Sequence, residues 1–223
     1  MSMRIVFMGT PQFAVPALKQ LASSFQAVVT QPDRPRGRGH RLLPSPVKEA
    51  ALALGVPVLQ PERVKDEQFL QQLTELAPDL IAVVAFGQIL PPALLAIPPL
   101  GCVNVHASLL PELRGAAPIQ RAIMNGETKT GITTMYMDQG LDTGDMIYQE
   151  EEAILPDDTA GSLAQRLAQK GADLLQRTVE AIGHGTAPRQ PQVSREASWA
   201  PPLTRDEEVL SWDKAASALA NPV

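Results

Sequence analysis

Over the first 150 residues, short apolar runs alternate with segments whose apolar side chains recur at helical spacing. The apolar runs predict strands at residues 4–8, 25–31, 56–61, 79–86 and Cys102–His106. The helical spacing predicts helices after residue 12 and at residues 46–54 and 66–76. Strands that are apolar throughout are buried on both faces, and helices between them favour parallel pairing. The pattern therefore predicts an α/β, Rossmann-like fold, a mostly parallel sheet flanked by helices.

The second half of the chain is predicted to carry two helices and two strands before the pattern fades. Residues 118–124 predict a helix, and residues 130–152 predict a strand, a Gly-rich loop and a return strand. Residues 158–182 hold the longest helical pattern, which Gly183 and Gly185 end. The following segment is rich in proline and poor in apolar residues, so we expect a linker. The predicted organisation is a main domain at 1–185, a linker at 186–205 and a short new unit at 206–223.

Composition narrows the class of protein. The chain has 223 residues, 44% of them hydrophobic, which suffices for a sizeable core. Its single cysteine, Cys102, excludes a disulfide framework or a cysteine-based zinc site within one chain. The three histidines lie far apart without spaced acidic partners, so we expect no metal. The N-terminal apolar stretch is too short for a membrane span, and we expect a cytoplasmic protein with no membrane partner.

Two polar residues interrupt an otherwise apolar strand. Asn104 and His106 share one face, because side chains alternate along a strand, while Val103 and Val105 point the other way. Asp142, on the later Gly-rich loop, can fold back to the same strand end. An amide that stabilises an oxyanion, an imidazole that exchanges a proton and a carboxylate that orients it suit acyl transfer to an amine. The alternative is a core histidine satisfied by a neighbour.

The exit from that strand reads Ser108, Leu109, Leu110, Pro111. One interpretation is a shaped apolar loop whose backbone groups hold a flat heterocycle. The other is a plain end of a strand. The four residues alone do not separate these two interpretations.

Positive charge gathers in one Pro- and Gly-rich segment, although the whole chain carries a net charge of −5. Residues 31–48 hold five basic side chains and only Asp33 as an acid; the basic residues are Arg34, Arg36, Arg38, Arg41 and Lys48. Flexible arginine-rich segments become ordered on phosphate backbones, so a mobile loop that binds nucleic acid is the functional interpretation. The alternative is a solvated loop that keeps the protein soluble.

Longer motifs add a resemblance. The stretches NVHASLLPELRGAAPIQRAIMNGE and TGITTMYMDQGLDTGDMI, within residues 104–147, resemble the folate-dependent formyltransferase family. The start RIVFMGTPQFAVPAL and the basic segment TQPDRPRGRGHRLLPSPVK are similar to the branch of that family that acts on initiator tRNA. The likeness covers nearly the entire chain, and its motifs are long and in order.

The resemblance implies the formyltransferase fold and transfer of a formyl group from 10-formyltetrahydrofolate to the α-amino group of methionine on initiator methionyl-tRNA. It carries catalytic roles onto Asn104, His106 and Asp142, and folate contacts onto residues 108–111. It also implies folate contacts near the pterin for Phe86, Gly87, Ile89 and Leu90. The five basic residues of the segment 31–48 are assigned to the acceptor arm of the tRNA.

The resemblance also bears on the C-terminal unit and on other functions. The family continues into an OB-like barrel, so residues 206–223 are expected to be a remnant of that domain, in a monomer whose tRNA affinity is in question. A relative that formylates another amine, such as that of a nucleotide sugar, or that hydrolyses the folate with water, stays open. A non-catalytic folate- or RNA-binding remnant also stays open.

Overall fold

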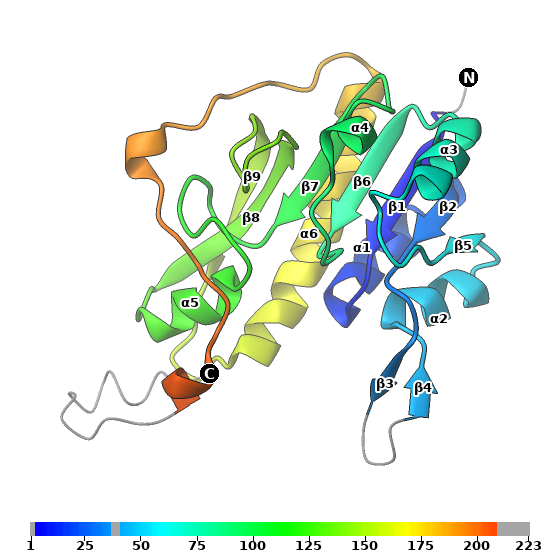
Figure 1. The fold of residues 1–223 in the computed structure, drawn as a ribbon. Coiled ribbons are helices and arrows are strands. Elements are labelled where there is room, and N and C mark those ends of the chain that lie inside the picture. Colours follow the sequence, from blue (N-terminus) through cyan, green and yellow to red (C-terminus); the bar gives the residue numbers. More distant parts are fainter. Residues whose placement is uncertain (1–2, 37–40, 209–223) are drawn as a thin grey trace.

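Seven strands form one sheet at the centre of the protein, seen in a computed structural model that describes residues 3–36 and 41–208 (Figure 1). The strands are β1 (Ile5–Gly9), β2 (Phe25–Val29), β5 (Val58–Leu59), β6 (Leu80–Val84), β7 (Cys102–His106), β8 (Lys129–Tyr136) and β9 (Met146–Ala153). Their order is β5-β2-β1-β6-β7-β8-β9. The first five run parallel, whereas β8 and β9 each pair antiparallel with the preceding strand. The predicted, mostly parallel α/β sheet is confirmed.

Helices cover both faces of this sheet. One face packs against α1 (Val15–Gln20), α2 (Pro46–Ala53), α5 (Pro118–Met124) and α6 (Ala160–Gly183). The other packs against α3 (Glu67–Leu76) and α4 (Pro92–Leu95). The predicted helices lie within a few residues of these bounds. Helix α4 was not predicted, because four residues that begin at a proline pair show no periodicity.

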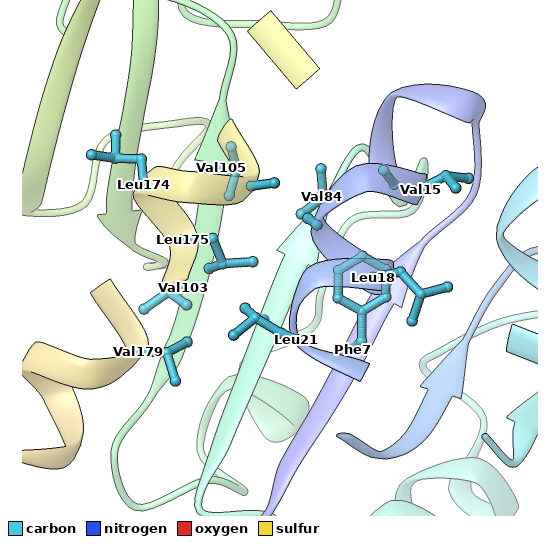
Figure 2. Close-up of a cluster of buried hydrophobic side chains, with 14 of the residues drawn as sticks. Phe7, Val15, Leu18, Leu21, Val84, Val103, Val105, Leu174, Leu175 and Val179 are labelled. Atoms are coloured by element: carbon cyan, nitrogen blue, oxygen red, sulfur yellow. The ribbon is translucent and has the colours of Figure 1, made fainter. Parts of the chain in front are cut away.

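The larger core lies between the central strands and the pair α1 and α6. Figure 2 shows Phe7, Val84 and Val105 from three neighbouring strands pointing at Leu18 of α1 and Leu175 of α6. Alternate residues of the same strands, such as Met8 and Cys102, are buried against α3 and α4 instead. Burial on both faces explains why these strands are apolar throughout.

Strand β1 has β2 on one side and β6 on the other, so the chain reverses its direction across the sheet at this point. In open α/β sheets, a crevice forms beyond the carboxyl ends of the strands at such a reversal. Thr10 follows β1 here, and its hydroxyl donates to the carbonyl of Phe86 after β6, at 2.8 Å. This bond ties the two strand ends together at the edge where a ligand is expected.

The sequence predicted a loop for the basic segment 31–48, but part of this segment forms strands. Strands β3 (Arg34–Arg36) and β4 (Arg41–Leu43) pair antiparallel and form a two-stranded ribbon that stands away from the sheet (Figure 1). Asp33 at the base of this ribbon accepts from Lys48 at 2.7 Å and from Gln60 at 2.8 Å. These contacts join residues far apart in sequence, so local composition did not reveal them.

The expected linker is also packed against the domain. We call residues 186–202 the strap; it runs from the end of α6 past β9 to α5 (orange in Figure 1). Gln190 and Met146 exchange both backbone hydrogen bonds, and Arg114 does the same with the residues on either side of Trp199. Backbone pairing, the Gln192 side chain and the buried Ala200 hold the strap, and none of these contacts follows from a run of apolar residues, which is why its composition suggested a linker.

The structure describes only the beginning of the predicted C-terminal unit 206–223. A short 3-10 helix spans Arg205–Glu208 and meets α5 through an ion pair between Glu207 and Arg121. Most of the predicted unit 206–223 lies outside the described residues. The division into a domain at 1–185, a linker at 186–205 and a remnant at 206–223 therefore stays a prediction.

Candidate active site

A cleft of about 1030 Å³ opens beyond the carboxyl ends of β6 and β7. Asn104, His106 and Asp142 all line it, so the fold brings the three predicted catalytic residues together. Asp142 reaches them from the loop between β8 and β9, which folds back over the end of β7. A single cleft of this size has room for a drug-sized ligand and part of a second one.

Asn104 presents its amide to this cleft from the middle of a buried strand. It pairs with Val83 of β6 on one side and with Met135 of β8 on the other, which fixes its position in the sheet. Among the described residues, none forms a hydrogen bond with the Asn104 side chain, although its neighbours in the strand are buried. The amide is therefore free to donate to a ligand oxygen.

His106 is held in one orientation by the carbonyl of Leu113. The distance from its Nε2 to this oxygen is 2.9 Å, and the side chain is only 6% exposed. A carbonyl can only accept, so Nε2 carries a hydrogen and Nδ1 is the atom that can gain or lose a proton. Nδ1 lies 3.7 Å from Oδ2 of Asp142. His106 thus has the partner expected of a core histidine and, in addition, a free nitrogen beside a carboxylate in the cleft.

Asp142 is fixed by both its side chain and its loop. Its Oδ2 accepts from the Gly115 N–H at 2.9 Å, and its side chain is 12% exposed. Its φ of 53° is a left-handed value, which aspartate tolerates better than most residues. Gly144 closes the same loop, since a Cβ there would lie 1.8 Å from the carbonyl oxygen of Tyr136. The loop therefore aims one carboxylate oxygen at Nδ1 of His106.

Cys102 shares the strand and the face of Asn104 but is no candidate nucleophile. It is buried, and its burial raises the pKa of the thiol to about 12. A thiol with that pKa is almost entirely protonated near neutral pH, and the thiolate is the reactive form. Asn104 and His106 therefore remain the candidates for chemistry on this face of β7.

The residues predicted near the pterin lie on one wall of the cleft. Phe86, Gly87, Ile89 and Leu90 all line it, on the loop that follows β6. Phe86 and Leu90 are buried, whereas Ile89 is 88% exposed. This wall offers an apolar surface to a flat ring, with backbone groups beside it.

Residues 108–111 are not among those that line the cleft. Thr133 of β8 organises this segment: its hydroxyl donates to the Ser108 carbonyl at 2.7 Å and accepts from the Leu110 N–H at 3.1 Å. The Ser108 hydroxyl donates to the Glu112 carbonyl at 2.6 Å, which closes the turn. The predicted folate contact of Ser108, Leu109, Leu110 and Pro111 stays a prediction.

Several cleft residues were missed from the sequence. Arg114 and Gly115 lie within the motif RGAAP but received no role, and Trp199 of the strap contributes a ring that is 59% exposed. Gly115 lets the strap lie close to this motif, because its φ is 123° and a Cβ would lie 2.7 Å from the carbonyl oxygen of Ala200. The motif RGAAP has no obvious reactive group, and the strap is Pro-rich. Neither feature of the sequence indicates that these residues line the cleft.

The five predicted tRNA-binding residues do not all end in the same environment. Arg34 lines a second cavity, of about 320 Å³, that shares Ala85, Phe86 and Gly87 with the cleft. Lys48 is already paired with Asp33. Arg36 and Arg41 are paired in the backbone register of the β3–β4 ribbon. Arg38 lies outside the described residues.

Residues 3–36 and 41–208 lack two features that indicate other classes of protein. In those ranges, no three His, Cys, Asp or Glu side chains are grouped so that they could hold a metal ion. No helix there is both long and apolar enough to cross a membrane.

Comparison with known proteins identifies the family. The family described as "Formyl transferase" matches residues 3–179. A methionyl-tRNA formyltransferase of Pelotomaculum thermopropionicum is 57% identical over 224 residues, which cover 99% of this chain and 71% of that relative. A sugar N-formyltransferase from Shewanella has the same fold, with a TM-score of 0.75 and 18% identity, over 99% of this chain and 87% of that one.

A third relative was solved with ligands. The N-formyltransferase from Helicobacter canadensis, in complex with folinic acid and dTDP-3-aminofucose, has a TM-score of 0.72 and 20% identity. The match covers 98% of this chain and 78% of that structure. Taken with the family match and the identity to the Pelotomaculum protein, these findings show that the chain belongs to the formyl transferase family.

Proposed function

We propose that this chain transfers a formyl group from 10-formyltetrahydrofolate to the α-amino group of methionine on initiator methionyl-tRNA. The observation that carries the proposal is the convergence of Asn104, His106 and Asp142 on one cleft, in a chain 57% identical to a methionyl-tRNA formyltransferase. The triad supplies groups for acyl transfer to an amine, and the relative indicates which amine.

The cleft residues have two roles in this reaction: one stabilises developing negative charge, and the others transfer a proton. 10-Formyltetrahydrofolate supplies the formyl group when bound. The Asn104 amide donates to the formyl oxygen as negative charge develops there. One well-placed donor of this kind stabilises the transition state by about 3–4 kcal/mol. In the reaction, a bond forms between the amine nitrogen and the formyl carbon, and the bond from that carbon to N10 breaks. The pair of His106 Nδ1 and Asp142 Oδ2 takes one proton from the amine and returns one to N10.

The cleft suits the formyl donor. The loop 86–90 offers an apolar wall for the flat ring, and Asn104 and His106 line the same cleft. The cavity beside Arg34 shares that wall and opens toward the β3–β4 ribbon. We assign the cleft to the formyl donor, and the cavity with the ribbon to the acceptor end of the tRNA.

The deciding experiment offers three acceptors to the same protein. Formyl transfer is followed from 10-formyltetrahydrofolate to methionyl initiator tRNA, to an amino sugar nucleotide and to water alone. We expect product on the tRNA at a rate well above both others. Faster transfer to the sugar, or hydrolysis that ignores the tRNA, would replace this function by one of the alternatives. Folate binding without any turnover would make the chain a non-catalytic remnant.

A further inference from the structure

Gln192 of the strap links a buried arginine to the loop that carries Asp142. Its Oε1 accepts from Arg114 twice, from Nε at 3.0 Å and from Nη2 at 2.6 Å. Its Nε2 donates to the carbonyl of Asp142 at 2.9 Å and to the carbonyl of Gly144 at 2.8 Å. One side chain thus makes two hydrogen bonds to nitrogen donors through Oε1 and two to carbonyl oxygens through Nε2, which also lies 4.0 Å from Sδ of Met135.

The chemistry of the partners determines how this amide is oriented. A guanidinium only donates and a carbonyl only accepts, so Oε1 must face Arg114 and Nε2 must face the loop. A carboxylate of the same size could still accept from Arg114, but it would place an oxygen against two carbonyl oxygens. Of the common side chains, a primary amide of this length is suited to both ends at once.

The loop depends on an anchor of this kind. Asp142 adopts a left-handed backbone with φ of 53°, and its carboxylate is held by the Gly115 N–H. That bond fixes the far end of the side chain, whereas Gln192 fixes the backbone at Asp142 itself and at Gly144 after it. Without the amide, the carbonyls of Asp142 and Gly144 lose their bonds to this side chain, and the loop stays tied to the strap at its end, through the Asp145–Arg189 ion pair and the Met146–Gln190 backbone pair.

We propose that Gln192 is a positioning residue, which holds the Asp142 carboxylate at the distance from His106 that formyl transfer requires. The inference rests on the proposed function, because Asp142 must take part in the reaction. It also gives the strap a role in catalysis, although this segment carries none of the triad. Gln192 acts through Asp142 and has no assigned contact with either substrate.

The first test compares three single variants in formyl transfer to methionyl-tRNA. For Gln192→Ala we expect kcat to fall by about 10- to 100-fold, since small displacements of a catalytic group cost that much, with KM for both substrates within about threefold. Gln192→Glu should do no better, because it keeps the arginine contact but opposes the two carbonyls. Gln190→Ala is the matched control: Gln190 lies in the same strap, and its exposed side chain has no hydrogen bond to a described residue.

A double-mutant cycle separates positioning from a general structural role. In an Asp142→Asn background, Gln192→Ala should change kcat by less than about threefold, since its partner in catalysis is already impaired. Equal fold-losses in both backgrounds would overturn the proposal. A wild-type kcat in Gln192→Ala or Gln192→Glu would overturn it too.

Two controls keep these outcomes apart. The melting temperatures of all variants are measured. If Gln192→Ala is unfolded at the assay temperature, its kcat is not interpreted, and Gln192→Glu, which keeps the arginine contact, serves as the test instead. Wild-type protein that fails to formylate methionyl-tRNA would contradict the proposed function itself. Active wild type with an unaffected Gln192→Ala would contradict only the positioning role.

Discussion

Asn104 is the residue whose role can be tested with the least disturbance to the fold. Its amide faces the cleft, and none of the described residues bonds to it, so its removal breaks no observed hydrogen bond. Asn104→Ala should lower kcat about 100-fold or more with little change in stability, because a single oxyanion donor contributes about 3–4 kcal/mol. Single-turnover formyl transfer is the measurement. Asn104→Asp should be at least as slow, since a carboxylate repels the charge that develops on the formyl oxygen.

Asn125→Ala serves as the control for Asn104. Asn125 is exposed at the end of α5 and its side chain makes no hydrogen bond with a described residue. It should keep the wild-type rate. An active Asn104→Ala would remove the oxyanion role and leave His106 and Asp142 to carry the reaction.

At the scale of elements, strand β8 illustrates how closely the sheet is packed. Gly131 lies within β8, and a Cβ there would be 2.3 Å from the carbonyl oxygen of Glu150 on β9. Gly131→Ala should therefore lower the free energy of unfolding by about 1–3 kcal/mol, as overpacking does. Gly161→Ala is the matched substitution, because its Cβ meets only an atom at 3.6 Å, in the first turn of α6. Urea unfolding should show that Gly161→Ala leaves the free energy of unfolding unchanged or raises it slightly. An equal loss of unfolding free energy in both variants would contradict the packing argument.

The start of α6 should give the protein part of its acid sensitivity. Arg166 donates to both carboxylate oxygens of Asp158 and also binds Glu152 on β9. The guanidinium, with the Ser162 hydroxyl and the Leu155 N–H, holds the pKa of Asp158 well below its ordinary 3.8. A carboxyl whose pKa is lowered by folding stabilises the protein above pH 4, and this stabilisation is lost as pH falls further.

Asp158→Asn tests this pH dependence. The variant should be less stable than wild type at pH 7, and the difference should shrink as pH falls below about 4. Urea unfolding across pH 2.5–7 measures it, with the exposed neighbour Asp157→Asn as the control. A difference that is constant with pH would show that Asp158 acts by packing rather than by charge.

Elements were predicted well where the pattern is local. The strands of the parallel sheet and the helices α2, α3, α5 and α6 were expected within a few residues of their bounds. The β3–β4 ribbon was missed, since its base is held by Asp33, Lys48 and Gln60 across long separations. The Thr10 hydroxyl donates to the carbonyl of Phe86, 76 residues later in the chain, and no local pattern indicates such a contact.

At the scale of the whole molecule, the basic ribbon should determine how tRNA affinity depends on salt. Neutralising Arg36, Arg38 and Arg41 to Gln should weaken binding of initiator tRNA while leaving folate affinity unchanged. Each lost phosphate contact removes about 0.7–0.9 from the slope of log K against log salt, so the slope should fall by up to about 2–3. Titrations at several salt concentrations measure it.

The control for the ribbon removes the same charge from another surface. Lys19, Arg63 and Lys65 are exposed and lie outside the ribbon, and their change to Gln should leave the slope nearly intact. Equal effects from both triple variants would mean that overall charge, not the ribbon, binds the tRNA. Lys48→Gln alone should matter less than a ribbon arginine, because Lys48 is already paired with Asp33.

The sequence by itself determined the α/β sheet, the shared face of Asn104 and His106, and the position of a ligand edge. These follow from periods of two and 3.6 residues and from parallel pairing, which local patterns carry. Only the tertiary structure decided that Nδ1 of His106 lies 3.7 Å from Asp142, that Trp199 of the strap lines the cleft, and that Gln192 of the strap holds the loop of Asp142. Those contacts are a close approach of two side chains, side-chain hydrogen bonds and backbone pairings between segments far apart in the sequence, and no local periodicity encodes them.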